Sequence, residues 1–448
     1  MSVSFFPLKW EATGNQWWYA SPIDCAAANA HYHLVREMLK FDNNHLFNLT
    51  SLRRIRRLEL VWDDDREQFK DVAKCRSEVA RKLFLECESK KGKKKENSLI
   101  RAGYGGWLMY TAASAGDLCF VQQLVEMNPL LVFGGGEYTV TDTFYAASKG
   151  KNCEVFKLVF DFALSPRFVT GKGRVILPSV YKWEMSNRAV HTASRGGNAE
   201  VLEMFLANCC DVLAYRDAQG STVLHSAAAT GQLEVVKYLT SSFDIINSTD
   251  DHGDTALHVA AYRGHLAVVE TLISASSSLI SIRNHAGETF LHKAVSGFQS
   301  PAFRRLDRQV ELLRKLLSGD KKFHMEEIIN AKNTDGETAL QVATTGNTKI
   351  PTDLIKLLKT APMIKPLQGL GYNSRKATTA SSSQMKNDRI CISPGTSFRM
   401  SDAKMLVLAG IEKNASDASS NTDQGSERMS STTSDSAAEN RPSRGTNQ

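Results

Sequence analysis

The sequence feature that most constrains this chain is a segment that recurs with a nearly fixed period. It reads Thr222-Val-Leu-His225-Ser-Ala-Ala, then Thr255-Ala-Leu-His258-Val-Ala-Ala, then Thr289-Phe-Leu-His292-Lys-Ala. The three threonines are 33 and 34 residues apart, and Arg188-Ala-Val-His191 lies 34 residues before Thr222. A period of this length indicates stacked supersecondary units, each of which needs its neighbours to bury its apolar face.

The residues around each motif predict a turn, a helix, a glycine and a second helix. Asp250-Asp-His-Gly253 suits a tight turn that needs side-chain bonding and a positive φ. Thr255 suits a helix N-cap, and Gly264 suits the position just past a helix end. Apolar residues at helical spacing follow over 266–273. The motif positions are Thr222, His225 and Gly231; Thr255, His258 and Gly264; Thr289 and His292; and His191.

These segments resemble the ankyrin repeat, whose Thr-Pro-Leu-His-x-Ala signature they share except that Val, Ala or Phe replaces proline. The resemblance covers about residues 20–360 and is strongest over 187–293. It implies an all-α solenoid of paired antiparallel helices with turn or hairpin tips, in which the motif histidine bonds backbone within and between repeats. The aromatic N-terminus, inserted helix and Ser-rich tail resemble plant ankyrin-repeat proteins without a transmembrane domain.

Breaks in the period and in composition divide the chain into four parts, with eight repeat units of varying quality. The parts are 1–40, an aromatic N-terminal cap and a degenerate first repeat; 41–106, an inserted helical segment with a basic loop; 107–361, ankyrin repeats; and 362–448, a Ser/Thr-rich disordered tail. The secure units are about 187–217, 218–250, 251–284 and 285–335. An apolar stripe predicts a long helix from Arg66 to Glu88, with the array interrupted again after Thr289.

Several segments allow two interpretations. Trp10, Trp17, Trp18 and Tyr19 either cap the first repeat or stack on a ligand. The basic runs at 53–57 and 90–95 are either solvated loops or a localisation or anion-binding signal. Residues 401–411 either lack structure or fold on a partner. Residues 361–371 either cover the last repeat, or the chain is a shortened form of a longer array.

The sequence offers no catalytic or cofactor signature. Phosphate-binding, nucleophile-elbow and kinase motifs are missing, so we expect no enzyme and no cofactor. The motif histidines are a full repeat apart, whereas metal ligands must converge on one ion, so we expect no metal site. Eight cysteines without a C-x-x-C pair indicate reduced thiols. The lack of a long apolar run and of a secretory signal favours a cytoplasmic protein, with the nucleus or a membrane surface as alternatives. The net charge of +7 is mild for this length and permits an anionic partner without requiring one.

The remaining expectation is recognition of a protein partner on the concave ankyrin surface. The resemblance places the variable positions at Gln219, Ser221, Thr230, Asp251, His252, Asp254, Tyr262, Arg263, His285 and Glu288. Tyr262 and Arg263 are the best candidates for a hot spot, because Tyr and Arg are enriched there; the alternative is that both are only solvated helix positions. The predicted function is a non-enzymatic scaffold or adaptor. The alternative is a peripheral binder of nucleic acid or anionic membrane through residues 53–57 and 90–95.

Overall fold

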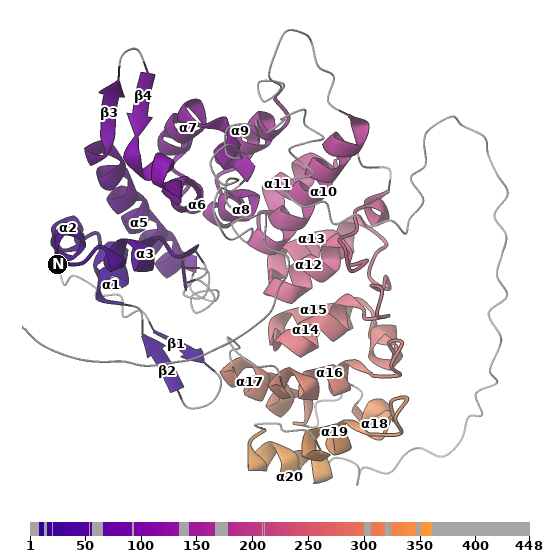
Figure 1. The fold of residues 1–448 in the computed structure, drawn as a ribbon. Helices are drawn as coiled ribbons and strands as arrows, with labels where there is room; N and C mark the ends of the chain where they lie inside the picture. Colours follow the sequence, from indigo (N-terminus) through magenta and orange to yellow (C-terminus); the bar gives the residue numbers. More distant parts are fainter. Residues whose placement is uncertain are drawn as a thin grey trace, which may run out of the picture.

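The structure is a computed structural model. It describes residues 9–12, 16–19, 21–52, 54–55, 66–91, 94–133, 143–165, 178–207, 209, 211–299, 306–318, 323, 325–345 and 350–360. In this part of the chain, antiparallel helix pairs stack side by side in sequence order, as Figure 1 shows. One helix of each pair lies in an inner row and the other in an outer row, and this confirms the predicted all-α repeat solenoid.

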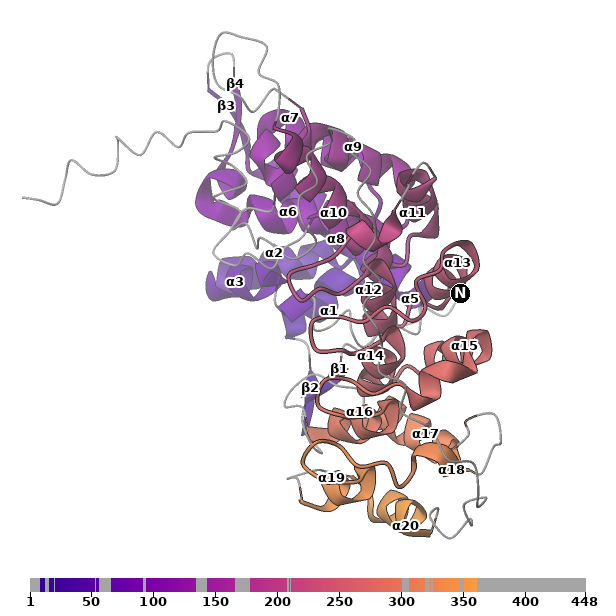
Figure 2. The same cartoon turned by 90° about the vertical axis from the view of Figure 1, so that its right-hand side faces the viewer.

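Each row is continuous, because neighbouring members from α6 and α7 onward contact one another (Figure 2). The inner row comprises α1 (Pro22–Ala28), α6 (Gly105–Ser114), α8 (Thr143–Gly150), α10 (Ser179–Gly196), α12 (Val223–Thr230), α14 (Ala256–Arg263), α16 (Phe290–Ser296) and α19 (Ala339–Thr345). The outer row comprises α2 (Tyr32–Phe41), α7 (Leu118–Met127), α9 (Cys153–Ala163), α11 (Ala199–Leu206), α13 (Leu233–Ser242), α15 (Leu266–Ala275), α17 (Leu306–Leu316) and α20 (Thr352–Thr360).

Short helices connect some of these elements. They are η1 (Ile100–Tyr104), η2 (Pro129–Phe133), η4 (Val212–Ala214), η5 (Ser277–Ser281), η6 (Gly297–Gln299) and α18 (Met325–Ile328). One cluster of buried apolar side chains extends from Ile23 in α1 to Leu358 in α20. Buried alanines such as Ala260 and Ala261 let inner helices approach closely, while Val and Leu of the outer helices fill the space between the rows. Each pair therefore shares its core with its neighbours.

The predicted long helix is α5 (Arg66–Glu86), and it packs between the first helix pair and α6. Before it, α3 (Asn44–Thr50) packs on α1 and α2. Phe84 of α5 makes an edge-to-face contact with Phe120 of α7, with ring centroids 5.4 Å apart. Arg81 pairs with Asp117 at 3.7 Å, just before α7. The inserted segment thus occupies the place of a neighbouring unit at the N-terminal side of α6.

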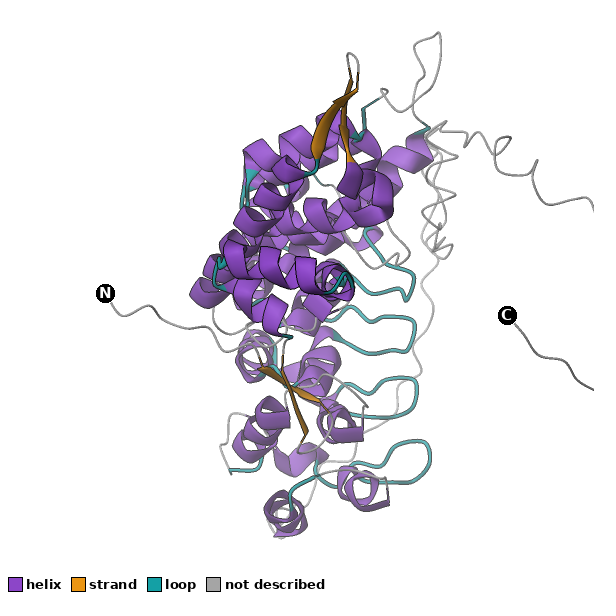
Figure 3. Ribbon diagram, turned by 60° about the vertical axis from the view of Figure 1, so that its left-hand side comes forward, coloured by secondary structure: helices purple, strands orange, loops and turns teal. Residues whose placement is uncertain are grey.

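Two short hairpins accompany the helices (Figure 3). The first pairs β1 (Lys9–Ala12) with β2 (Gln16–Tyr19), and the second pairs β3 (Glu88–Lys91) with β4 (Lys94–Asn97). The lysine-rich run was expected to be a loop, so its pairing corrects that expectation. A run of lysines has no period-two apolar pattern, and the sequence therefore gave no strand signal.

The unit around His191 also differs from expectation. Its inner helix α10 begins at Ser179, so Arg188 lies inside the helix and not at its N-cap. An arginine lacks the short side-chain acceptor that stops a helix at Thr222 or Thr255, and the helix continues upstream. Tyr181 is buried on this extension, and its hydroxyl donates to the carbonyl oxygen of Ala163 at 2.8 Å. Residues 179–184 are therefore part of the helix.

The predictions for 361–371, for the tail at 362–448 and for its segment 401–411 lie outside the described residues. The same holds for Arg53, Arg56 and Arg57 of the first basic run.

Candidate functional site

Loops of one shape project from one side of the array before α12, α14, α16 and α19 (Figure 3). We call them finger loops; they span residues 217–221, 250–254, 284–288 and 333–337. In the second loop, Asp250 Oδ1 accepts the N–H groups of His252 and Asp254, both at 2.9 Å. Gly253 has a φ of 76°, and a Cβ there would lie 2.8 Å from the backbone nitrogen of His285, so glycine is required.

The finger loops are hydrogen-bonded to one another through their backbones. The N–H of Asp251 donates to the carbonyl oxygen of Gln219 at 3.0 Å, and the N–H of His285 donates to that of His252 at 2.9 Å. The N–H of Thr334 continues the series by donating to the carbonyl oxygen of Ala286 in the preceding loop at 2.9 Å. The loops therefore form a ladder with a fixed register, and their tip side chains are presented in a defined order.

Three motif histidines, His225, His258 and His292, each join their own helix cap to the next repeat. The Thr255 N–H donates to His258 Nδ1 at 3.2 Å, and the Thr255 hydroxyl lies 2.9 Å from the same nitrogen. His258 Nε2 lies 3.2 Å from the carbonyl oxygen of Glu288, which can only accept, so Nε2 carries the proton. Burial lowers the pKa of His258, which keeps the ring neutral. His225 and His292 repeat these contacts.

His191 bonds differently because its unit lacks the threonine cap. Its Nδ1 lies 2.8 Å from the Ser226 hydroxyl on the neighbouring inner helix. Burial lowers the pKa of His191 to about 4, so the ring is neutral at physiological pH. On the N-terminal part of α10, the Trp183 ring stacks on the Tyr215 ring with centroids 4.9 Å apart. The Asn187 side chain donates to the Arg216 carbonyl oxygen at 2.9 Å. The helical extension thus covers the start of the first finger loop.

Two predicted binding residues, Asp254 and Glu288, belong to an ionic network at the base of the finger loops. Lys293 Nζ lies 3.0 Å from Asp254 Oδ2 and 3.2 Å from Glu288 Oε2. Asn284 Nδ2 donates to Asp254 at 2.8 Å and to Glu288 at 3.1 Å. The two carboxylates raise the pKa of Lys293 against the opposing effect of burial. This network joins residues of two finger loops to α16.

The predicted hot-spot residues lie together at the C-terminal end of α14. The guanidinium carbon of Arg263 lies 5.9 Å from the centroid of the Tyr262 ring, within the range of a cation–π contact. Arg263 is exposed and Tyr262 is half-buried. Gly264 ends the helix with a φ of 77°. The arrangement offers one aromatic face and one cation beside the inner helices.

The other predicted positions lie on the finger loops or near helix ends. Gln219, Asp251, His252 and His285 are exposed at the loop tips. Ser221 is half-buried. The hydroxyl of Thr230 donates to the Ser226 carbonyl oxygen of its own helix at 3.2 Å.

A second set of contacts between repeats was missed from the sequence. Side chains at the start of outer helices donate to carbonyl oxygens near the C-terminal ends of preceding inner helices. The pairs are Asn152 to Gly116 at 3.0 Å, Gln232 to Arg195 at 3.1 Å, His265 to Ala229 at 3.3 Å and Gln309 to Ala261 at 2.9 Å. Gln232 and His265 each directly follow the motif glycine, and this recurrence is the signal that could have revealed them.

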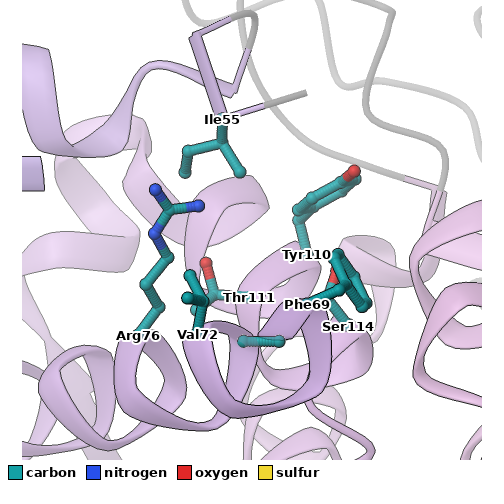
Figure 4. Close-up of a pocket in the computed structure, with 8 residues that line it drawn as sticks. Ile55, Phe69, Val72, Arg76, Tyr110, Thr111 and Ser114 are labelled. Carbon is teal, nitrogen blue, oxygen red and sulfur yellow. The ribbon is translucent and has the colours of Figure 1, made fainter. Parts of the chain in front are cut away.

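Figure 4 shows a small pocket between α5 and α6. Phe69 and Val72 contribute apolar walls, and Arg76, Thr111 and Ser114 contribute polar atoms. The hydroxyl oxygens of Thr111 and Ser114 are buried and have no hydrogen-bond partner among the described residues. The contact between the inserted helix and the array therefore contains buried hydroxyl groups that are not hydrogen-bonded to the described residues.

Part of the first basic run serves the fold. Arg54 pairs with Asp24 at 3.5 Å, and the Asp24 carboxylate also accepts the Ser21 N–H at the start of α1 at 2.9 Å. Asp24 is buried, so Arg54 offsets a buried negative charge. This arginine contributes to the first helix cap.

Among the described residues, no group of three or more His, Cys, Asp or Glu side chains could hold a metal ion. Within the same residues, no helix is long and apolar enough to cross a membrane. Among the described residues, Cys75, Cys87, Cys119 and Cys153 form no disulfide.

The stacked pairs, the finger loops and the bonds of the motif histidines define a helical repeat protein. Residues 224–273 and 257–306 each match the family model for ankyrin repeats (many copies). The chain is an ankyrin-repeat protein, as the motifs suggested. No curated protein matches it.

Proposed function

We propose that this chain is a non-enzymatic scaffold that binds a protein partner on the surface formed by the finger loops and the inner helices. Ankyrin repeats generally mediate protein–protein interaction and are typically non-enzymatic, and the family match covers α12 to α16. The compartment that we propose is the cytoplasm.

The ladder of finger loops is the observation that carries this proposal. Its loops are bonded to each other, so the exposed side chains of Gln219, Asp251, His252 and His285 need little further ordering when a partner binds. A preorganised surface loses less conformational entropy on association and therefore binds more tightly. The tips also combine amide, acidic and imidazole groups, which suit a polar rim.

Tyr262 and Arg263 supply the centre of the proposed surface. Helix α14 has eight residues, so its C-terminal end lies about 12 Å along the axis from the second finger loop. A partner that spans this distance contacts both the loop tips and the Tyr262–Arg263 pair. Tyr and Arg contribute strongly at interfaces because each combines a large flat group with hydrogen-bonding capacity.

Asp254 and Glu288 have a different place in this proposal. Both carboxylates already interact with Lys293 and Asn284, so they hold the loop bases in position. A partner would need to replace these bonds in order to use either carboxylate directly. We therefore place the direct contacts at the loop tips and at the end of α14.

A photo-crosslinking amino acid placed at three positions of the full chain tests the surface. His252 and Arg263 lie on the proposed face, whereas Lys237 is exposed on the outer helix α13 and is the matched control. We expect one shared partner to crosslink in cells from positions 252 and 263, not from 237. The Tyr262→Ala/Arg263→Ala variant should weaken capture from position 252 at least tenfold. Equal capture from position 237, or no effect of the double substitution, would contradict the proposal.

A further inference from the structure

The last described helix pair, α19 and α20, lies at the C-terminal end of the array (Figure 2). It packs on the preceding pair, because α19 contacts α16 and α20 contacts α17. No further helix pair follows it among the described residues, which end at Thr360. A unit of a repeat array buries its apolar side chains against neighbours on both sides, so the burial of this last pair can be compared with that of earlier pairs.

Two apolar side chains of the last pair, Leu340 of α19 and Ile355 of α20, are only half-buried. The residues at the same positions of the three preceding units are fully buried: Leu224, Leu257 and Leu291 for the first, and Val236, Val269 and Leu313 for the second. Each of those units has a following unit beside it. The last pair therefore leaves open an apolar surface that the earlier units bury. We call this surface, with Leu340, Ile355 and the neighbouring Gln341, the end face.

Gln341 has its amide group at the position of the motif histidines. Its Oε1 accepts the Thr338 N–H at 2.8 Å, which completes the cap of its own helix. In the preceding unit, His292 Nε2 lies 3.2 Å from the carbonyl oxygen of Glu337 in the following unit. Gln341 Nε2 is the corresponding donor, and no described residue accepts a hydrogen bond from it. The end face thus combines open apolar surface with a donor at the position that bonds to the next unit elsewhere.

The sequence after Thr360 lies outside the described residues and lacks the repeat frame, since no histidine follows position 324. One segment of it nevertheless has the length of an inner helix. Ser401 suits an N-cap, Gly410 suits the position after a helix end, and residues 405–409 are all apolar. The same spacing of nine residues separates the cap from the helix-ending glycine in two regular units: Thr222 from Gly231, and Thr255 from Gly264.

Residues 361–400 connect this segment to α20. These 40 residues can extend over roughly 130 Å, whereas the next position in the array is only about 10 Å from α19. The nearer segment 361–371 also contains apolar residues, but Pro362 and Pro366 prevent a helix of the same length there. The chain therefore has one segment with the reach and the helix signals to follow α19.

We propose that residues 401–411 dock on the end face of the same chain as a final helix beside α19. Leu406 and Val407 occupy the positions of Ala260 and Ala261, which are buried between inner helices, so their burial would cover the open apolar surface. Gln341 Nε2 would donate to a main-chain carbonyl oxygen at the start of this helix, as His292 does to Glu337. A covered outer face on the terminal unit keeps a repeat array soluble.

The proposed helix differs from a complete repeat unit. The regular units have a glycine two residues before the capping threonine, as Gly253 stands before Thr255, whereas Arg399 stands at that place before Ser401. The segment therefore covers the helices without extending the ladder of finger loops. The end face is also separate from the finger-loop tips and from the end of α14, so this proposal and the proposed partner surface can fail independently.

A photo-crosslinking amino acid at position 359 of the purified full chain tests the contact. Lys359 is exposed and lies four residues after Ile355, on the same side of α20. We expect crosslinks from position 359 to peptides containing residues 401–411. Position 237 on α13 is the control, because Lys237 is also an exposed lysine of an outer helix but is followed by another unit. It should give no crosslink to these peptides.

Mixing nitrogen-15-labelled and unlabelled chains before irradiation shows whether the segment belongs to the same molecule. Docking within one chain predicts crosslinked peptides that are either fully labelled or fully unlabelled, at a yield that does not change on dilution. Peptides that join a labelled to an unlabelled chain would overturn the proposal in favour of a second copy at the end face.

A double substitution in the segment tests the role of its apolar residues. Leu406→Asp/Val407→Asp should reduce the crosslink from position 359 and accelerate amide hydrogen exchange in α19 about tenfold, because α19 loses a neighbour and opens more readily. Exchange in α12 should stay unchanged, which checks that the fold is retained. The control Ser430→Asp/Ser431→Asp adds the same charge elsewhere in the tail and should have neither effect.

Three further outcomes would overturn the proposal. Crosslinks from position 359 to residues 361–371 alone would make that segment the cover of the end face. Equal effects of the two double substitutions would show that only the charge of the tail matters. Unchanged exchange in α19 after Leu406→Asp/Val407→Asp would show that the segment does not protect this helix.

Discussion

His258 Nε2 donates a hydrogen bond to the carbonyl oxygen of Glu288, 3.2 Å away in the next repeat. The other nitrogen of the same ring accepts the N–H of Thr255 at 3.2 Å. One neutral side chain thus completes its own helix cap and joins two repeats. Because His258 is fully buried, removing the ring leaves the buried Thr255 N–H and the partly buried Glu288 carbonyl oxygen without partners.

Replacing His258 by leucine should therefore lower the free energy of unfolding by about 3 kcal/mol, since unsatisfied buried groups cost about 1–3 kcal/mol each. Glutamine should be tolerated better. In the last unit, the amide oxygen of Gln341 already accepts the Thr338 N–H at 2.8 Å in the same frame position. Urea unfolding checks this order of stability in His258→Leu and His258→Gln, with the exposed His252→Ala as the control. A glutamine variant as unstable as the leucine variant would contradict the assigned bonds.

Acid should destabilise the array before its carboxylates titrate. Burial lowers the pKa of His191 to about 4 and lowers the pKa of His225, His258 and His292 below the ordinary value of 6.5. In the unfolded chain these rings take up protons near pH 6.5, so the unfolded state binds more protons and stability falls as pH falls below that value. At pH 5.5 the His191 ring lowers the free energy of unfolding by about 1.4 kcal/mol.

Urea unfolding at pH 7.5, 6.5 and 5.5 measures this loss. His191→Gln should reduce the dependence by the contribution of one proton. A free energy of unfolding that stays constant or rises from pH 7.5 to 5.5 would be inconsistent with neutral buried rings.

The Lys293 network gives a test of ion pairs in different environments. The Lys293 side chain is 20% exposed and contacts two carboxylates, whereas the Lys237 side chain is 52% exposed and pairs with Glu234. Lys293→Met leaves Asp254 and Glu288 close together without their cation, so we expect a loss of about 2 kcal/mol. Lys237→Met should change stability by less than about 0.5 kcal/mol. Thermal unfolding compares the two, and equal effects would show that the network adds nothing to an ordinary surface pair.

The repeats were predictable because their determinants recur at one spacing. Thr255, His258 and Gly264 each have a local role that the residue type reveals: a cap, a bridging ring and a helix end. The long helix α5 was predictable from its apolar stripe alone. In both cases, the local pattern and the packing in the array favour the same structure.

Other features could not be predicted, since they depend on contacts between segments with no shared pattern. Lys293 occupies a position where neighbouring repeats have Ser226 and Val259, so its partners Asp254 and Glu288 were not apparent. Gln309 follows an insertion that breaks the period, which hides its bond to Ala261. The direct binding role of the loop-tip residues remains a prediction.

Two buried threonines in different surroundings should respond in opposite ways to the same substitution. The Thr222 hydroxyl lies 2.8 Å from His225 Nδ1 at the cap of α12, whereas the Thr111 hydroxyl is buried beside the α5–α6 pocket without a partner among the described residues. Thr222→Val should cost about 1–2 kcal/mol, because it removes an N-cap. Thr111→Val keeps the shape and removes an unsatisfied polar atom, so it should raise stability by up to about 1 kcal/mol. Calorimetric melting of both variants measures these changes in stability. A less stable Thr111→Val variant would show that a bound water or another group satisfies this hydroxyl.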